Sequence, residues 1–277
     1  MKEKTANQII ELQKAQPAPG FEMYGLRHAH LDPFMDVTLF HMSEPVFPPH
    51  PHAGFSAVSY MTPESEGSFI NRDNLGDHAR IDPGDTHWTQ AGSGMMHEET
   101  PAEPGVICTG FQIFVKLSEA EEMSTPEAFH VTASKTPVLN ADGWTGKVIC
   151  GEVNGCAGGL MQTRHDVFLV DVAAEPGAAI RLNLKEGSSA WAFIREGSVL
   201  HEDKAVAPVS SILFSQTGDS ISLMAGQGGV RALVGGGTPL NQEFLFGGPF
   251  AMTTSTRLNE AKRRYASGEM GRLSPSF

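Results

Sequence analysis

Short apolar runs separated by glycine, proline and aspartate constrain the fold of this chain more than any other feature. One series of such runs extends from about Phe34 to Val115, and a second with a similar rhythm begins near Thr145. Glycine (30) and proline (18) make up about 17% of the 277 residues, above the usual share of about 12%. Turns at this density predict many short strands. The repeated rhythm predicts an all-β chain of two β-barrels in tandem.

The expected domain boundary lies in an acidic, polar stretch from Ser118 to Glu127, which contains Pro126 and is typical of a connector. We therefore expect one domain at 1–130 and another at 131–277. Helices are expected to be few. The clearest is predicted at about 255–267, with Thr254 or Ser255 as the N-cap and Gly268 as the stop signal, and it is assigned to the second domain.

The charge and composition of the chain exclude several classes of protein. A formal net charge of -12 argues against a nucleic-acid partner, because surfaces that bind phosphates are basic. No apolar run approaches the roughly 18 residues that a membrane span requires, and the first ten residues lack the apolar segment of a secretory signal. The three cysteines form no CxxC pair, which indicates ordinary thiols. We expect a cytoplasmic protein with no membrane partner.

Two histidine-bearing segments, HPH at 50–52 and HEE at 97–99, carry the chemistry. Each places two metal-binding residue types at positions i and i+2. Side chains at this spacing point to the same face of a β-strand. Two such strands facing each other in a barrel would bring His50, His52, His97 and Glu99 to one point.

Three imidazoles and one carboxylate suit a divalent transition metal such as iron, nickel, copper or zinc. Four protein ligands on an ion that prefers six leave two positions open, which indicates chemistry and not a structural site. From the pattern alone, the alternative is that the four residues are unrelated polar side chains. A further pair, His28 and His30, has no partner ligands at comparable spacing, and we assign it no metal.

The segment HPHAGF at 50–55, followed by RDNLG at 72–76, resembles the pirin family. The long second motif of the pirin family is matched in order and spacing by PGD at 83–85, Trp88, AGSG at 91–94 and HEETP at 97–101. GGPFAMT at 247–253 is similar to the tail motif of the family. The resemblance is strong over about 34–117 and weaker over 145–265.

The resemblance implies two cupin (jelly-roll-like) barrels, a bicupin, with a single metal in the N-terminal barrel. Mapped by motif, the metal ligands are His50, His52, His97 and Glu99, and the C-terminal barrel has none. The implied cofactor is Fe(II), with nickel, copper, manganese or zinc as alternatives. This chain has Ala53 and Ser56 where the family motif commonly has arginine and glutamate, so substrate choice and partner recognition do not transfer directly.

Two functions of different classes remain open. The first is a metal-dependent dioxygenase that acts on quercetin-like flavonols or other enol-bearing aromatic compounds, with Glu99 as the catalytic proton acceptor. Phe55, Met95, Met96 and Trp88 are then candidates for pocket walls. The second is a non-enzymatic regulatory protein that binds protein partners and senses redox state through its metal. Both functions require the same four ligands.

Overall fold

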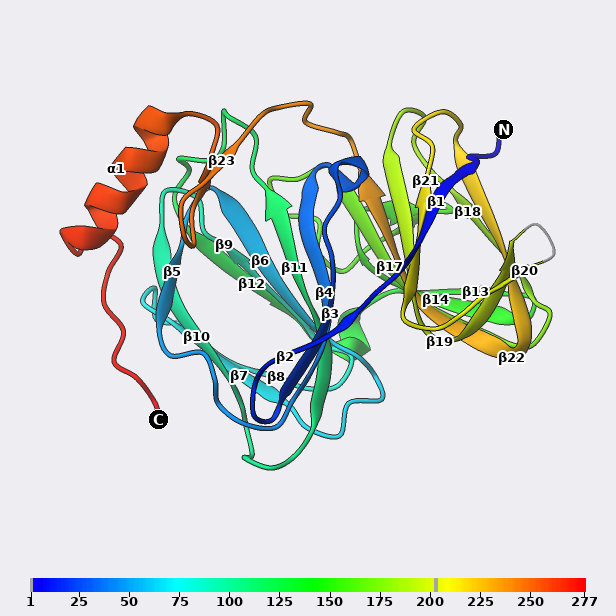
Figure 1. Ribbon diagram of the computed structural model, residues 1–277, viewed down its shortest axis with the longest axis horizontal. Helices are drawn as coiled ribbons and strands as arrows, with labels where there is room; N and C mark the ends of the chain where they lie inside the picture. The colour runs from blue at the N-terminus through cyan, green and yellow to red at the C-terminus, as the bar shows by residue number, and fades with distance from the viewer. Residues whose placement is uncertain (1, 202–203) are drawn as a thin grey trace. The chain divides into compact units, whose positions relative to one another are not determined.

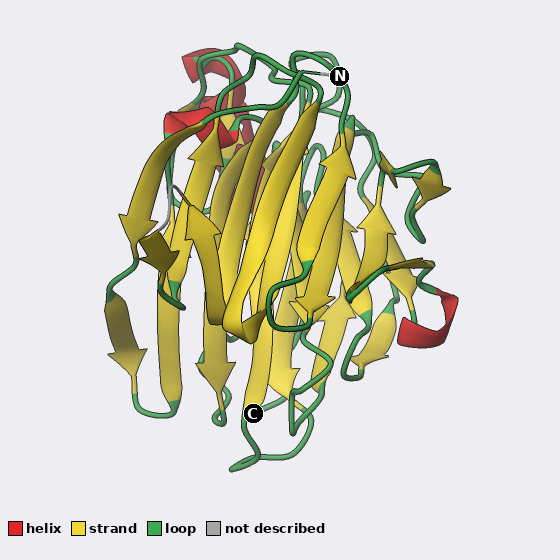
Figure 2. Cartoon of the chain, turned by 90° about the vertical axis from the view of Figure 1, so that its right-hand side faces the viewer, coloured by secondary structure: helices red, strands yellow, loops and turns green. Residues whose placement is uncertain are grey.

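The computed structural model describes residues 2–201 and 204–277, and it divides the chain into two compact units. The first barrel unit comprises Lys14–Gly25, Phe34–Ala133 and Leu240–Phe277. The second barrel unit comprises the residues up to Gln13 together with Leu26–Pro33 and Ser134–Pro239. Strands dominate both units (Figures 1 and 2), so the predicted all-β class is confirmed.

Two antiparallel sheets form the first barrel unit. One sheet has the strand order β12-β9-β6-β11-β4-β3-β2 and the other β5-β10-β7-β8. Phe40 of the larger sheet stacks on Phe69 of the smaller with ring centroids 5.0 Å apart, so apolar side chains fill the space between the sheets. The strands are β2 (Lys14–Ala18), β3 (Phe21–Leu26), β4 (Phe34–Met42), β5 (His50–His52), β6 (Phe55–Met61), β7 (Phe69–Asp73), β8 (His78–Ile81), β9 (Thr86–Gln90), β10 (Met95–Pro101), β11 (Cys108–Lys116) and β12 (Glu127–Val131).

A nine-stranded sheet forms the second barrel unit, with the path β1-β21-β19-β22-β17-β14-β13. The 18-residue strand β22 pairs with β18 through its first part and with β17 and β19 through its last part. Apolar side chains from several strands of this sheet, among them Val170, Ile194 and Val234, form one hydrophobic core in this unit. The nine strands are β1 (Ala6–Glu11), β13 (Val138–Ala141), β14 (Trp144–Cys150), β17 (Val167–Ala174), β18 (Ala179–Asn183), β19 (Ser189–His201), β20 (Lys204–Val206), β21 (Ser210–Phe214) and β22 (Ser220–Gly237). A separate two-stranded sheet is formed by β15 (Glu152–Val153) and β16 (Cys156–Ala157).

The predicted terminal helix is present as α1 (Ser255–Ala266), and the Thr254 side chain caps it by accepting from the Arg257 backbone N–H at 3.2 Å. It follows the short hairpin β23 (Leu245–Phe246) and β24 (Ala251–Met252). In the described part of the chain, two short 3₁₀ turns are also present, η1 (Ala29–Leu31) and η2 (Ala133–Lys135). No helix among the described residues is long and apolar enough to cross a membrane.

Both ends of the chain lie in a different unit from the one that the sequence suggested. The expected division was 1–130 and 131–277, with the helix in the second domain. In the structure α1 and the rest of Leu240–Phe277 belong to the first barrel unit, and β1 belongs to the second. The physical reason is pairing: β1 adds to the edge of β21, while Phe250, Met252 and Leu258 bury their side chains against Ala53.

Glu122 explains how the segment after β24 is held. It lies in the stretch expected to be a solvated connector, yet its side chain is fully buried and pairs with Lys116 at 2.6 Å. The same carboxylate accepts from the Thr253 backbone N–H at 3.0 Å and from Arg257 at 2.8 Å. Burial of a paired charge is tolerated because every oxygen has a donor.

Candidate metal centre

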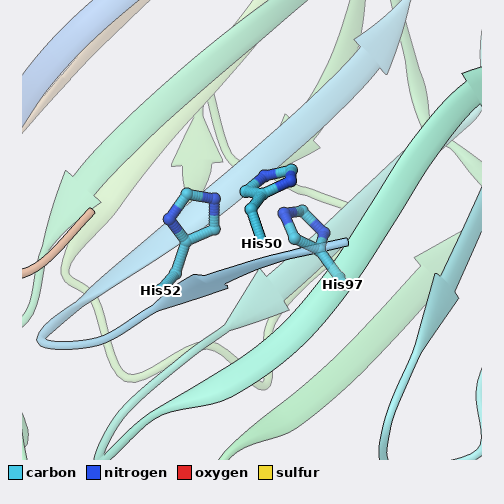
Figure 3. A group of neighbouring side chains, drawn as sticks. All are labelled: His50, His52 and His97. Atoms are coloured by element: carbon cyan, nitrogen blue, oxygen red, sulfur yellow. The ribbon is translucent and has the colours of Figure 1, made fainter. Parts of the chain in front are cut away.

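Two neighbouring strands bring the three predicted histidine ligands together. β5 and β10 pair antiparallel, with His97 directly opposite His50 and Met95 opposite His52. Because residues at i and i+2 share a face of a strand, His50, His52 and His97 all point to the same side. Figure 3 shows the three rings converging from these two strands.

The imidazoles lie at distances that one ion can bridge. One ligand atom from each ring lies within 4.8 Å of the others. The ring centroids of His50 and His97 are 4.6 Å apart, and those of His52 and His97 are 4.9 Å apart. His52 and His97 are buried, whereas His50 is partly exposed. The cluster is therefore open to solvent on the side of His50.

Hydrogen bonds hold two of the rings by their Nδ1 atoms. His50 Nδ1 lies 2.9 Å from the Pro48 carbonyl oxygen, and His97 Nδ1 lies 3.1 Å from Asn71 Oδ1. A carbonyl oxygen only accepts, so at Pro48 the ring nitrogen donates and its Nε2 is left as a lone-pair donor. His97 Nε2 is buried and has no hydrogen-bond partner among the described residues. A bare, buried imidazole nitrogen beside two other imidazoles fits a metal ion.

Burial keeps the three rings in the form that binds metal. Loss of solvent lowers the pKa of His52 to about 3, with the neighbouring His50 adding to the effect. Burial also lowers the pKa of His97 well below its usual value, and His52 and His50 lower it further. The pKa of the more exposed His50 is lowered as well, again mainly by burial. All three imidazoles are therefore neutral at pH 7, as metal ligands must be.

Glu99, the fourth predicted ligand, lies on β10 two residues beyond His97 and faces the same side of the sheet. Among the described residues, the group of side chains close enough to share one ion consists of the three histidines and does not include Glu99. Its carboxylate accepts a hydrogen bond from the Ser59 hydroxyl, which shares the barrel interior. Burial raises the pKa of Glu99 to about 7, and the Ser59 contact opposes this rise. Its role as a ligand stays a prediction.

Glu98, which lies between His97 and Glu99, points to the opposite face of β10, as strand alternation requires. It pairs with Arg72 of β7, and it accepts from the Ser276 backbone N–H at 3.1 Å. The pair His28 and His30, to which the sequence assigned no metal, lies on and beside η1 in the second barrel unit. Their rings stack on each other at 4.9 Å.

Aromatic side chains surround the histidine cluster. The rings of Phe55 and Phe114 lie 5.0 Å and 5.6 Å from that of His52, and Phe47 lies 6.2 Å from His50. Phe244, from the segment that precedes β23, packs in the same apolar group as Phe55 and Phe114. The sequence suggested only Phe55 among these residues. The others come from distant parts of the chain, and no local pattern marks them.

Comparisons with known proteins agree with this architecture. A family model described as pirin matches residues 14–115, and one described as the pirin C-terminal cupin domain matches residues 169–271. A pirin-like protein of Solanum lycopersicum is 30% identical over 246 residues, which cover 87% of this chain and 83% of that protein. Pirin of Homo sapiens is 30% identical over 251 residues, which cover 87% of this chain and 84% of that protein.

Solved structures share the fold at lower sequence identity. A quercetin 2,3-dioxygenase from Acinetobacter baumannii has a TM-score of 0.85 and 24% identity, covering 97% of this chain and 99% of that one. A bacterial pirin from Escherichia coli in complex with nickel(II) has a TM-score of 0.68 and 13% identity, covering 84% of this chain and 99% of that one. Two cupin domains, matched by both family models, make the chain a bicupin. On these grounds the chain belongs to the pirin family.

Proposed function

We propose that this protein is a metal-dependent dioxygenase that acts on flavonol-like or other enol-bearing aromatic compounds. One transition metal ion would be held in the first barrel unit by His50, His52 and His97, with Glu99 as the fourth ligand in the resting site. The observation that carries the proposal is the cluster of three neutral imidazoles, whose ligand atoms lie within 4.8 Å of one another and one of which keeps a buried, bare Nε2.

The donor set supports iron as the metal. Three imidazoles and a carboxylate suit Fe(II), and nickel, copper, manganese or zinc are the alternatives. When bound, the ion supplies Lewis acidity toward a substrate hydroxyl and reactivity toward dioxygen. The structure of an Escherichia coli pirin with nickel(II) supports a metal in this fold.

Glu99 is the residue that would hold the substrate proton. Burial raises the pKa of Glu99 to about 7 in the metal-free protein, so a Glu99 carboxylate released from the ion would be a stronger base than an exposed one. Ser59 donates to the carboxylate and fixes its orientation. Loss of the Glu99 contact to the ion would free an oxygen to accept the proton of an enol hydroxyl.

The aromatic surroundings support an aromatic substrate. Phe47 is 40% exposed beside His50, the most accessible of the three histidines. Phe55 and Phe114 flank His52. Offset or edge-on contacts between such rings and a planar ligand contribute about 0.5–1.5 kcal/mol each beyond the area they bury.

The test is oxygen uptake by iron-loaded protein across a panel of flavonols and related enols. Wild-type protein should consume oxygen with at least one of them. Glu99→Gln should retain some metal, because the amide oxygen still coordinates, and it should lose about 10²- to 10⁴-fold in turnover, because an amide does not accept the proton. His28→Ala is the matched control and should be neutral.

Two outcomes would contradict the proposal. An active wild type whose rate is unchanged by Glu99→Gln would rule out the base role. Full iron occupancy with no oxygen uptake on any enol would favour the other function, a redox-sensing protein that binds protein partners through its acidic surface.

A further inference from the structure

Asn71 links the candidate metal centre to a carboxylate at the end of the barrel. It lies on β7, fully buried, and directly opposite Glu99 in the register of β10. Its Oδ1 atom lies 3.1 Å from His97 Nδ1, and its Nδ2 atom lies 3.4 Å from Asp77 Oδ2. Asp77 follows β7 in the turn to β8, and its side chain is 35% exposed.

The turn that carries Asp77 is held in place by its own hydrogen bonds. The Asp77 backbone N–H donates to Asp73 Oδ1 at 2.9 Å, and the Asp73 backbone N–H donates to the Asp77 carbonyl at 3.1 Å. The Leu75 backbone N–H donates to the same Asp73 oxygen at 2.8 Å. These bonds fix the backbone of the turn from which the Asp77 side chain reaches Asn71.

Asp77 decides which way the Asn71 amide points. An ionised carboxylate accepts hydrogen bonds and does not donate them. The amide nitrogen of Asn71 must therefore face Asp77, because the reversed amide would place its oxygen against the carboxylate. The amide oxygen then faces His97, so His97 Nδ1 must carry the hydrogen. The Nε2 atom of His97 is left bare, in agreement with its lack of a partner among the described residues.

We propose that Asp77, Asn71 and His97 form a carboxylate–amide–histidine chain in which Asn71 is a positioning residue for the metal centre. These hydrogen bonds set the His97 tautomer and leave Nε2 free, so that it would bind an ion held by the three histidines. This inference rests on the proposed metal centre for its function, although the tautomer itself does not require a metal.

The amide also tunes how strongly His97 binds. A carboxylate that accepts directly from a ligand histidine raises the basicity of the ring. Here the carboxylate acts through an amide, and the second hydrogen bond at 3.4 Å is longer than a strong one. Removing the acceptor should weaken metal binding, since loss of such a partner costs about 10- to 100-fold in affinity.

The first experiment reads the tautomer in metal-free, full-length protein by long-range ¹H–¹⁵N correlation of the histidine rings. Wild-type His97 should carry its proton on Nδ1, and Asn71→Leu should give a mixture of tautomers. A wild-type ring protonated on Nε2 would overturn the inference. This readout does not depend on whether the protein takes up metal.

The second experiment measures Zn²⁺ affinity by competition with a chelator. Asn71→Leu should weaken binding about 10- to 100-fold, and Asp77→Asn should weaken it less. The double variant Asn71→Asp/Asp77→Asn places the carboxylate on His97 and the amide beyond it, and should restore affinity to the wild-type value or above it. Thr62→Val is the matched control, because Thr62 is fully buried and hydrogen-bonded in the same unit.

The outcomes separate this inference from the proposed function. Wild-type protein that takes up no Zn²⁺ would count against the metal centre. The tautomer experiment would still test the hydrogen bonds that link Asp77, Asn71 and His97. Metal binding that Asn71→Leu changes no more than Thr62→Val would overturn the positioning role. If Asn71→Leu does not fold, Asp77→Asn, at its partly exposed turn position, takes its place in both experiments. A His97 tautomer and a Zn²⁺ affinity that both equal those of wild type would then overturn the inference.

Discussion

Glu99→Gln should stabilise the metal-free protein in alkaline solution and leave it unchanged in acid. Burial raises the pKa of Glu99 from 4.5 to about 7. Because the folded pKa is the higher one, the contribution of this carboxyl to the free energy of unfolding is complete below pH 4.5 and is lost as the pH rises through 7. A difference of about 2.5 pH units corresponds to about 3 kcal/mol. Glutamine does not titrate, so the variant should keep this stability.

The assay is urea unfolding of chelator-treated wild type and variant at intervals from about pH 4.5 to about pH 9. The difference in the free energy of unfolding should grow from near zero to about 3 kcal/mol in favour of Glu99→Gln. Glu98→Gln is the control on the opposite face of β10. Burial opposes ionisation there, but hydrogen bonds from Arg72 and Ser276 leave the pKa of Glu98 lowered.

The sign for Glu98 is therefore reversed. A pKa that is lower in the folded state than in the unfolded state stabilises the protein at pH values above the pKa of the unfolded state, and this stabilisation is lost in acid. Glu98→Gln should therefore be less stable than wild type at high pH. A difference between Glu99→Gln and wild type that is flat across the pH range would refute the reasoning. A change of stability in the same direction for both variants would refute it as well.

Further predictions concern the metal and the docking of the chain's last segment. Elemental analysis of protein purified without added metal should find close to one equivalent of metal, most of it iron. The metal content should fall at acidic pH, because protonated imidazoles do not bind metal. Two equivalents of metal, or full metal retention in the double variant His50→Ala/His97→Ala, would contradict the assignment. Gly54→Ala should lower the melting temperature and expose the segment after β23 to proteases, because Gly54 has φ +83° and a Cβ would meet the Ala251 carbonyl oxygen at 2.0 Å. Gly76→Ala is its control, with φ +98° and no atom within 4 Å, and a loss as large as that of Gly54→Ala would show that contact with Ala251 is not the cause.

The parts of the fold that were predictable from sequence are those set by local spacing. The pairs at 50–52 and 97–99 lie on strands, as the i, i+2 pattern indicated, and the three histidine rings come together. They do so from neighbouring strands of one sheet and not from two strands that face each other across the barrel. The helix at Ser255–Ala266 begins after its predicted N-cap, Thr254. Alternation and capping act within a few residues, so a single sequence reveals them.

The parts that were not predictable depend on pairings between distant residues. Glu122 reads as one more acid in a polar stretch, and its burial follows from Lys116 and Arg257, the latter 135 residues away. Asn71 carries no motif of its own, and its role emerges from the register of β7 against β10. The placement of β1 likewise depends on its pairing with β21, and that of α1 on the apolar cluster around Ala53.

The last segment of the sequence, Leu240–Phe277, belongs to the first barrel unit, and this has a consequence for biosynthesis. A ribosome makes Phe34–Ala133 early, but Leu240–Phe277 of the same unit emerges only after the whole of Ser134–Pro239 has been made. Until then the nascent first barrel unit lacks the residues that cover Ala53 and pair with its backbone. Strand β5, which precedes Ala53, is therefore covered only after Leu240–Phe277 has been made, and a metal ion would find the finished site only from then on.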